Sequence, residues 1–419
     1  MPQLVLENLR RVVTCAAAQA GPLLRDAMSE LAPLDGDLCV AVADGRVAFV
    51  GARAQLPREF AAAPRHDCEG RLLTPALIDC HTHPAFVRAR ADEFEQRMAG
   101  ATYEEIAAAG GGILSSMRSV READDASLLR HTTRNLRLLR GHGVAVVEGK
   151  SGYGLSLEHE LRQLAAIRDS GEASDMHTIR TCLAAHSLPA EFRGSIEKRR
   201  EYLALVREQI LPQAAAEGFA QRADVFCEKG VFTPEETRAV AEAAQKAGLR
   251  VTIHAEQLHP SGGAAVAAAV GADSADHLEF LEQPSANAMR DAGVAAVLLP
   301  GSTHALRMDK WADGRALVDA GLCVALATDF NPGSSPIANP AFVMNLAVMH
   351  CGLNAAEALA AFTVNAAHAL RLDTREWGRI AKGSRAAFAL WDVDHEREIP
   401  YYAGSNLCAG VITCAGWRS

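Results

Sequence analysis

The chain has 419 residues, of which 49% are hydrophobic and 22% are charged, and these values are typical of a folded globular protein. Its formal net charge of −9 argues against nucleic acid and against an anionic membrane surface as the main partner. The longest apolar stretches, such as 294–299, fall far short of the roughly 20 residues that span a bilayer, and residues 1–15 lack the pattern of a signal peptide.

The two ends of the chain predict short strands. Residues 39–51 contain two alternating strand-like runs separated by Asp44-Gly45, a pair that favours a two-residue type I′ hairpin turn. The segments 385–392 and 408–414 are again rich in β-formers and poor in helix signals. Both ends therefore predict strands of one small sheet or sandwich.

Between these ends, short apolar runs alternate with segments of helical period, such as the amphipathic segment 234–248 with its glycine stop. This alternation predicts βαβ units and a parallel sheet. The expected strands are 72–79, 144–148, 179–185, 223–227, 250–253, 274–276, 294–299 and 323–328. Eight such strands predict a closed barrel. The predicted fold is α/β, a (β/α)8 TIM barrel over residues 71–374, with a small β-sandwich from residues 1–70 and 375–419.

Active sites of such barrels lie at the C-terminal ends of the strands. Side chains that can bind a metal or transfer protons stand at the ends of most of the predicted strands. They are His81, His83, Glu148, Lys150, His186, Glu228, His254, His277 and Asp329. A single histidine at a strand end is usually an ordinary hydrogen-bonded residue. Five histidines at one rim indicate a functional site.

The sequence His81-Thr82-His83 brings two imidazoles to one face of a strand, because alternate residues share a face. With His254 after the fifth strand and Asp329 after the eighth, they form a set of three histidines and one carboxylate. These donors suit Zn²⁺, with iron or manganese as alternatives. A water bound to such an ion would have its pKa lowered towards about 7 and would act as a nucleophile.

This arrangement resembles the amidohydrolase superfamily, and the local sequences resemble the imidazolonepropionases within it. The motifs extend over nearly the whole predicted barrel: PALIDCHTH (75–83), TYEEIAAAGGGI (102–113), EGKSGYGL (148–155), AAHSLPAEF (184–192), HAEQL (254–258), SADHLEF (274–280), LLPGST (298–303), TDFNPGSS (328–335) and TVNAAHAL (363–370). The resemblance implies that one metal ion per chain, zinc by preference or iron, is held by His81, His83, His254 and Asp329. Superfamily members with two metals often carry a bridging modified lysine where this chain has Phe226-Cys227-Glu228, which implies a single ion.

The resemblance implies hydrolysis of the cyclic amide ring of 4-imidazolone-5-propanoate to N-formimidoyl-L-glutamate, a step in histidine degradation. His277 would hydrogen-bond the metal-activated water or the developing oxyanion and would shuttle protons. Asp329 would bind the metal and accept the proton of the water. Gln257 stands where some members carry glutamate, and because an amide cannot act as a base, proton transfer falls to His277 or Asp329.

The implied substrate is a small anionic heterocycle. Arg90, seven residues after His83, matches the arginine that binds its carboxylate through a planar fork, with Arg88 as the alternative. The resemblance adds further substrate-binding residues: Tyr103, Tyr153, His186, Gln257, Asn331, Gly333 and Ser334. The run Gly110-Gly111-Gly112 lacks the lysine and the preceding strand of a phosphate loop, and predicts a flexible loop over the pocket.

Two alternative functions stay open. The same fold hosts deaminases and cyclic amidohydrolases that act on other small heterocycles. A metal-free scaffold that binds a ligand or partner is the second alternative, although the intact donor set argues against it. The family resemblance implies a homodimer. The ten cysteines form no CxxC pair and several lie in apolar runs, which predicts a reduced, cytoplasmic protein.

Overall fold

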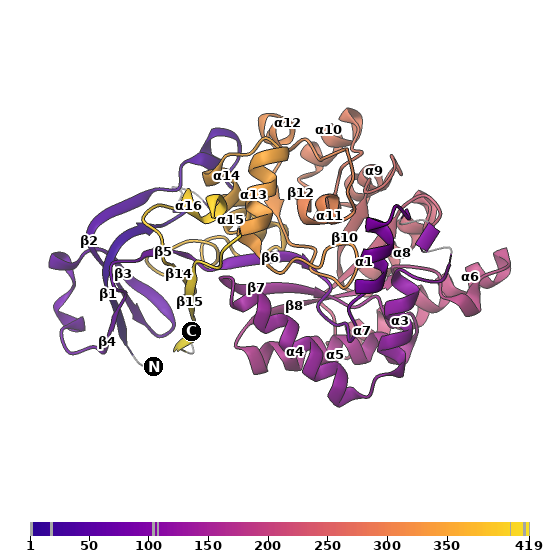
Figure 1. Ribbon diagram of the computed structural model, residues 1–419, viewed down its shortest axis with the longest axis horizontal. Helices are drawn as coiled ribbons and strands as arrows, with labels where there is room; N and C mark the ends of the chain where they lie inside the picture. Colours follow the sequence, from indigo (N-terminus) through magenta and orange to yellow (C-terminus); the bar gives the residue numbers. More distant parts are fainter. Residues whose placement is uncertain are drawn as a thin grey trace.

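The computed structural model describes residues 3–16, 20–102, 105–106, 109–402, 404–413 and 416–418. It contains two eight-stranded sheets that lie next to each other along the long axis of the molecule (Figure 1). In the described part of the chain, no helix is both long and apolar enough to cross a membrane.

The larger body is a barrel of parallel strands that follow one another in chain order. Its strands are β6 (Leu77–Thr82), β7 (Val144–Lys150), β8 (His177–Ala185), β9 (Arg222–Cys227), β10 (Arg250–Ala255), β11 (Ser274–His277), β12 (Ala295–Leu298) and β13 (Val324–Leu326). The barrel closes just beyond β13, where the Asp329 amide donates to the His81 carbonyl at 3.0 Å and the His83 amide donates to the Phe330 carbonyl at 2.9 Å. The predicted (β/α)8 barrel is confirmed.

Helices surround the barrel and connect its strands (Figure 1). They are α1 (Ala91–Met98), α3 (Ile113–Glu122), α4 (Asp125–Arg140), α5 (Leu157–Ser174), α6 (Ile196–Leu205), α7 (Leu211–Ala216), α8 (Pro234–Lys246), α9 (Gly263–Val270), α10 (Gln283–Ala292), α11 (Pro300–Ala305), α12 (Gly314–Asp319), α13 (Pro340–His350), α14 (Ala355–Ala361), α15 (Val364–Ala369) and α16 (Glu398–Tyr401). A π-helical turn over Val206–Ile210 joins α6 to α7.

Helix α8 shows how local sequence sets the limits of a helix. It begins with a capping box in which the Glu236 amide donates to Thr233 Oγ1 at 3.3 Å, and the Thr233 amide donates to Glu236 Oε2 at 2.9 Å. Pro234 occupies the first turn, where no amide hydrogen is needed. After the last turn, Gly248 adopts a φ of +86°, which glycine reaches without steric strain. The predicted helix is confirmed.

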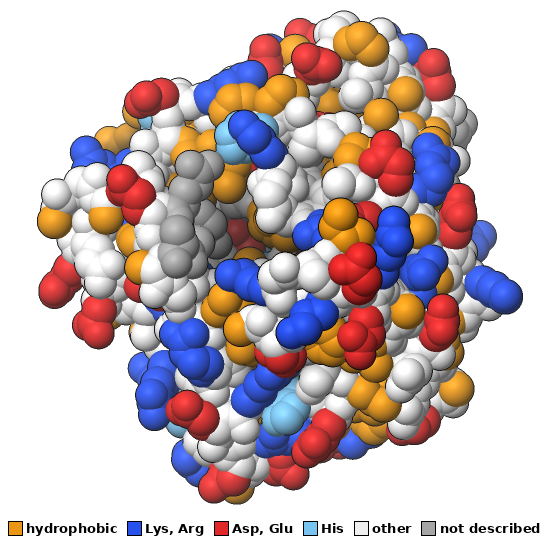
Figure 2. All heavy atoms as spheres, turned by 90° about the vertical axis from the view of Figure 1, so that its right-hand side faces the viewer, with side chains coloured by type: hydrophobic (Ala, Val, Ile, Leu, Met, Phe, Trp, Pro, Cys, Tyr) orange, Lys and Arg blue, Asp and Glu red, His pale blue; other side chains and the backbone are white. Residues whose placement is uncertain are grey.

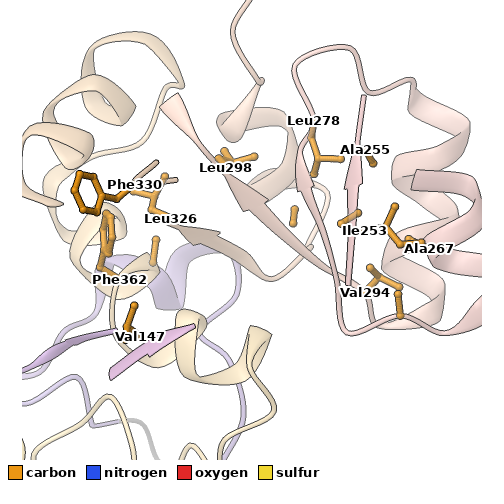
Figure 3. Close-up of a cluster of buried hydrophobic side chains, with 14 of the residues drawn as sticks. Val147, Ile253, Ala255, Ala267, Leu278, Val294, Leu298, Leu326, Phe330 and Phe362 are labelled. Atoms are coloured by element: carbon orange, nitrogen blue, oxygen red, sulfur yellow. The ribbon is translucent and has the colours of Figure 1, made fainter. Parts of the chain in front are cut away.

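Apolar side chains fill the space between the strands and the helices (Figure 3). Ile253 of β10 lies beside Ala267 of α9, while Leu326 of β13 packs near Phe330 and Phe362. Full burial of a large apolar side chain contributes about 1.5–3 kcal/mol. This core keeps the strands, and therefore the residues at their ends, in fixed positions.

Both ends of the chain form the second sheet, in the order β16-β15-β14-β5-β1-β2-β3 with β4 beside β1. Its strands are β1 (Leu4–Val13), β2 (Pro33–Ala43), β3 (Arg46–Ala52), β4 (Arg65–Asp67), β5 (Leu72–Pro75), β14 (Phe388–Trp391), β15 (Cys408–Thr413) and β16 (Gly416–Arg418). Asp44 and Gly45 have φ values of +51° and +71°, so the predicted hairpin turn is confirmed. Side chains of β1, β2, β14 and β15 share one apolar cluster, which joins the two ends.

The prediction of a single strand over 72–79 is wrong. The Ala76 amide donates to the Ala387 carbonyl at 3.0 Å in the second sheet, whereas the Leu77 amide donates to the Gly143 carbonyl at 2.8 Å in the barrel. The apolar run continues across this junction because both strands are buried, so periodicity does not reveal the break. The division into residues 1–70 with 375–419 and 71–374 stays a prediction.

Candidate active site

The candidate site lies at the C-terminal ends of the barrel strands, which point away from the second sheet. Figure 2 looks onto this end of the molecule and shows a hollow near its centre. The candidate pocket is lined by His83, Arg90, Ile113, Tyr153, His186, Phe226, His254, Gln257, His277, Asp329, Asn331 and Ser334. All of these except Ile113 and Phe226 are residues singled out from the sequence.

Three histidines form a cluster whose geometry could hold a metal ion. His81 lies in β6, His83 directly follows that strand, and His254 lies near the end of β10. One ring nitrogen from each lies within 4.8 Å of the other two. The structure thus brings together three residues that are separated by up to 173 positions in the sequence.

Asp329 faces this cluster from the end of β13. Its Oδ1 atom lies 3.6 Å from His81 Nε2 and 3.3 Å from His83 Nε2. His81 Nε2 is buried and has no hydrogen-bond partner among the described residues. Buried polar atoms are nearly always hydrogen-bonded, so a ring nitrogen in this setting fits a metal ligand. Three imidazoles and one carboxylate also fit the donor chemistry of zinc and iron sites.

Burial controls the charge of these side chains. It lowers the pKa of His81 and of His83 well below the usual value, and the nearby charge of Lys150 acts in the same direction. Both rings are therefore neutral at neutral pH, and the neutral imidazole is the form that binds metal. Burial raises the pKa of Asp329, and the neighbouring His277 partly offsets this rise.

Two buried aspartates lie next to the Nδ1 atoms of His81 and His254, two of the three histidines that could bind a metal. His81 Nδ1 is hydrogen-bonded to Asp276 Oδ2 at 2.6 Å, and His254 Nδ1 lies 2.8 Å from Asp224 Oδ2. A carboxylate that accepts from Nδ1 leaves the lone pair on Nε2 for a metal. No sequence motif singles out these two aspartates. A carboxylate inside a buried strand is rare, and this rarity could have marked both residues as functional candidates.

His277 ends β11 beside the same cluster. Its ring centroid lies 5.3 Å from that of His254 and 5.6 Å from that of His81. Burial lowers the pKa of His277 to about 3, so its ring is uncharged at neutral pH. The backbone is unusual here, because His277, Leu278 and Asp329 have φ values of +85°, +74° and +52°. Such conformations cost about 1–3 kcal/mol each and cluster at functional sites.

Arg90 contributes a buried guanidinium to the pocket wall. Its side chain is 5% exposed, and its Nη1 lies 3.7 Å from Glu93 Oε2. Within the described ranges, neither Nε nor Nη1 of Arg90 has a hydrogen-bond partner. Arg88 is exposed and lines a different surface pocket. Of the two arginines considered from the sequence, only Arg90 lies where an anion in the candidate pocket could contact it.

Asn331 organises the loop after β13. Its Oδ1 accepts hydrogen bonds from the amides of Gly333, Ser334 and Ser335 at 2.9, 2.8 and 3.2 Å. Its Nδ2 donates to the backbone carbonyl of Asp329 at 2.6 Å. One side chain therefore fixes the backbone of this loop on both sides of Asn331 in the chain.

Gly333 packs against Arg90 and is not among the residues that line the candidate pocket. A Cβ atom at Gly333 would lie only 1.6 Å from Arg90 Nη2, so no larger residue fits beside this guanidinium. Arg97 donates to the Gly333 carbonyl at 3.1 Å and ties the loop to α1. Arg97 was not singled out from the sequence, because its contact is with backbone distant in the chain.

The opposite wall of the pocket is largely aromatic. His186 Nδ1 lies 3.0 Å from the Gly152 carbonyl, which fixes the orientation of the ring. The rings of Tyr153 and Phe226 have centroids 5.4 Å and 6.1 Å from that of His186. Phe226 and Ile113 were missed in the sequence because an apolar side chain at a site resembles one in the core.

The remaining predicted residues have different outcomes. Gln257 lines the candidate pocket and donates to Ser302 Oγ at 3.2 Å, which fixes its amide. Tyr103 lies outside the described residues. The Gly112 amide donates to Glu93 Oε1 at 3.0 Å just before α3 begins. Movement of the Gly110–Gly112 loop stays a prediction.

Sequence comparisons place these observations in a family. A model described as "Amidohydrolase family" matches residues 72–413. Curated relatives named "Imidazolonepropionase" include one from Geobacillus sp. (strain WCH70), 41% identical over 98% of this chain and 97% of its own length. The relative from Polaromonas sp. is 44% identical over 93% and 91%, and that from Cupriavidus pinatubonensis is 45% identical over 90% and 88%.

Solved structures show the same fold at much lower identity. A 5-methylcytosine deaminase from Klebsiella pneumoniae, liganded with phosphonocytosine, has a TM-score of 0.74 at 18% identity and covers 99% of this chain and 98% of its own. A triazine hydrolase variant has a TM-score of 0.70 at 16% identity, with 99% and 94% coverage. The sequence relatives resolve the family further than these folds do: the chain belongs to the amidohydrolase family and, within it, to the imidazolonepropionases.

Proposed function

We propose that this chain hydrolyses the ring amide of 4-imidazolone-5-propanoate to N-formimidoyl-L-glutamate, a step in histidine degradation. The observation that carries this proposal is that a metal-competent histidine cluster, faced by Asp329, shares one pocket with the buried guanidinium of Arg90. The sequence relatives support this reaction over deamination of another heterocycle, because the deaminase likeness is one of fold alone.

His81, His83, His254 and Asp329 would hold one metal ion, and zinc is the ion we propose, with iron as the alternative. When bound, the ion supplies a Lewis acid that activates water at neutral pH. His81 and His83 are uncharged, and the Nε2 atoms of both lie close to Asp329 Oδ1, which supports this assignment. Elemental analysis of the purified protein tests which metal is present.

Asp329 and His277 would move the protons. Water attacks the ring carbonyl carbon, and Asp329 accepts the proton that this water gives up. The uncharged His277 takes up this proton and passes it to the ring nitrogen as the carbon–nitrogen bond breaks. The carbonyl carbon thereby becomes a carboxylic acid, which ionises by releasing its remaining proton to solvent, and the ring nitrogen becomes the terminal nitrogen of the formimidoyl group. Gln257 takes no part in proton transfer, since an amide is not a base.

Arg90 would pair with the propanoate carboxylate of the substrate. A buried guanidinium can hold a carboxylate through two parallel hydrogen bonds, and such bonds are among the strongest in proteins. The substrate ring would lie against the aromatic wall. We assign the remaining substrate contacts to Tyr103, Tyr153, His186, Gln257, Asn331 and Ser334. Gly333 would act on the substrate through Arg90, against which it packs.

We also propose that the protein is a cytoplasmic homodimer. All nine described cysteines are free, and eight of them are buried, which is typical of a protein from a reducing compartment. The family resemblance supports the dimer. Sedimentation of the purified protein, at concentrations that span the micromolar range, tests the oligomeric state.

The decisive experiment follows the ultraviolet absorbance of freshly prepared 4-imidazolone-5-propanoate. Metal-loaded protein is expected to remove this absorbance rapidly and to stop doing so after chelation, and added zinc should restore the rate. His81→Ala is the matched control for the metal site. Metal-loaded protein that leaves the absorbance unchanged would contradict the substrate and would favour another cyclic amide or amidine.

A further inference from the structure

Lys150, the last residue of β7, lies fully buried behind the metal-competent histidines. Its Nζ atom is 2.8 Å from Glu148 Oε1, 2.8 Å from Asp224 Oδ2 and 3.9 Å from Asp276 Oδ2. One ammonium group therefore lies among three buried carboxylates. None of the proposed catalytic steps uses this lysine.

Two of these carboxylates contact the metal-competent rings directly. Asp276 is the 2.6 Å partner of His81 Nδ1, while Asp224 lies 2.8 Å from His254 Nδ1 and also accepts the His254 amide at 3.1 Å. Lys150 thus connects two histidines that lie in different strands, His81 in β6 and His254 in β10. It reaches each of them through one aspartate.

The third carboxylate holds the lysine itself. Glu148 accepts hydrogen bonds from both Lys150 and the hydroxyl of Thr181, so the ammonium is fixed by neighbouring strands β7 and β8. Burial lowers the pKa of Lys150, but attraction by Asp224, Glu148 and Asp276 outweighs it and leaves the pKa raised. The side chain is therefore positively charged.

The electrostatics explain why a cation is needed at this point. Buried carboxylates close together repel one another strongly, because a protein interior screens charge less than water does. Removal of a buried cation leaves its partners uncompensated. Without the Lys150 ammonium, Asp224 and Asp276 would lose the positive charge that attracts both of them.

We propose that Lys150 is a positioning residue of the metal site, whose ammonium holds Asp224 and Asp276 against the Nδ1 sides of His254 and His81. The two rings then present Nε2 to the metal. This inference rests on the metal site proposed above. It assigns to Lys150 an effect on metal affinity and geometry, and no contact with the substrate.

The first test is Lys150→Met, compared with Lys246→Met, which removes an exposed lysine from the last turn of α8. Zinc affinity is measured on metal-free protein by competition with a chromophoric chelator. Loss of residues that orient metal ligands typically weakens affinity about 10- to 100-fold, and we expect this for Lys150→Met alone. The visible spectrum of the cobalt-substituted protein should also change, since it reports ligand geometry and is insensitive to a general loss of stability.

A second variant keeps the test decisive if Lys150→Met does not fold. The double variant Lys150→Met/Glu148→Gln removes one positive and one negative charge, so the net charge is unchanged. The side-chain hydrogen bonds of Glu148 are with Lys150 and Thr181, and we expect the same 10- to 100-fold loss of zinc affinity. Zinc affinity within twofold of wild type and an unchanged cobalt spectrum in a folded variant would overturn the inference. A double variant that is obtained only unfolded would also overturn the inference, because the contacts of Lys150 would then be required for folding.

The controls separate this inference from the proposed function. If wild-type protein binds zinc but does not hydrolyse 4-imidazolone-5-propanoate, the proposed substrate is wrong. The zinc-affinity test of Lys150 is still valid in that case. Wild-type protein that hydrolyses this substrate, together with variants of unchanged affinity, contradicts the inference alone. Wild-type protein that binds no metal contradicts both.

Discussion

The two ends of the barrel both carry buried charged or polar groups, but these groups are partnered differently. At the N-terminal end, Asp273 contacts Arg250 at 2.7 Å, Arg371 at 2.9 Å and Arg222 at 3.0 Å. At the C-terminal end, His81 Nε2 and His277 Nδ1 are buried without a hydrogen-bond partner in the described part of the chain. The first end pairs its buried carboxylate with three arginines, which contributes stability, whereas the second leaves histidine nitrogens available for ligands.

Positive φ values occur at both ends of the barrel. The chain enters β10 and β12 through Gly248 and Gly293, whose φ values of +86° and +69° cost glycine little. At the C-terminal end, His277 and Asp329 adopt positive φ although they carry side chains. Glycine has no side chain that could act at a site, so a functional residue must accept the strain there. The candidate active site thus carries backbone strain at two residues whose side chains the proposed mechanism uses.

The largest expected effect comes from the proton carrier at the C-terminal end. His277→Asn should lower kcat about 10²- to 10⁴-fold, because an amide cannot accept and return a proton. Metal content should remain at the wild-type level, since His277 is not in the proposed ligand set. Steady-state kinetics and elemental analysis of the same preparation provide the measurement. A turnover close to wild type would show that protons follow another route.

The carboxylate partner gives the next largest effect. Arg90→Ala should raise KM for the substrate about 10- to 150-fold, the range expected for hydrogen bonds to a charged group of about 1.5–3 kcal/mol. Arg88→Ala is the matched control and should leave KM within about twofold, because Arg88 is exposed outside the candidate pocket. A larger effect at Arg88 than at Arg90 would reverse the assignment.

Gly333 tests whether packing positions this arginine. Gly333→Ala should raise KM about 10-fold, because the new Cβ would collide with Arg90 and displace it, at a cost of about 1–2 kcal/mol. Gly404→Ala is the control, as a Cβ there meets no atom within 4 Å. An unchanged KM in Gly333→Ala would show that the guanidinium can move aside without loss of binding.

The N-terminal end should affect stability and leave turnover unchanged. Arginine hydrogen bonds, with Arg250 the largest contributor, outweigh burial and lower the pKa of Asp273. A carboxylate whose pKa is lowered by folding stabilises the protein above its unfolded pKa of about 3.9, and this stabilisation disappears as the pH falls through the folded value. Asp273→Asn should therefore lower the free energy of unfolding by about 2–4 kcal/mol at pH 7, with kcat unchanged.

The measurement is thermal unfolding of wild type, Asp273→Asn and the exposed control Asp291→Asn between pH 7 and pH 3. The difference between wild type and Asp273→Asn should stay constant down to about pH 4 and shrink below it. A difference that is independent of pH throughout would contradict the ionic origin of this stabilisation.

Much of the architecture was predictable because it depends on local chemistry. The Asp44-Gly45 turn, the capping box of α8 and the alternation of strands with helices are all set by residues close together in the chain. The histidines at strand ends were predictable for the same reason. Once strands are parallel, their C-terminal ends meet at one rim, so His81, His83 and His254 had to converge.

Only the tertiary structure decided how these residues are supported. The run 72–79 is uniformly apolar, and nothing in its period shows that Ala76 and Leu77 bond to different sheets. Likewise, the family resemblance favours Arg90 but leaves Arg88 as an alternative, and the structure separates them because Arg90 is buried and Arg88 is exposed.

The same holds for the contacts of Lys150 with Asp224 and Asp276, which join strands far apart in the chain. The sequence by itself determined the barrel, the candidate metal ligands and the class of chemistry, because these follow from residue type and periodicity. The tertiary structure decided which charges are buried, paired or left facing the pocket, because those properties exist only once the barrel closes and excludes water.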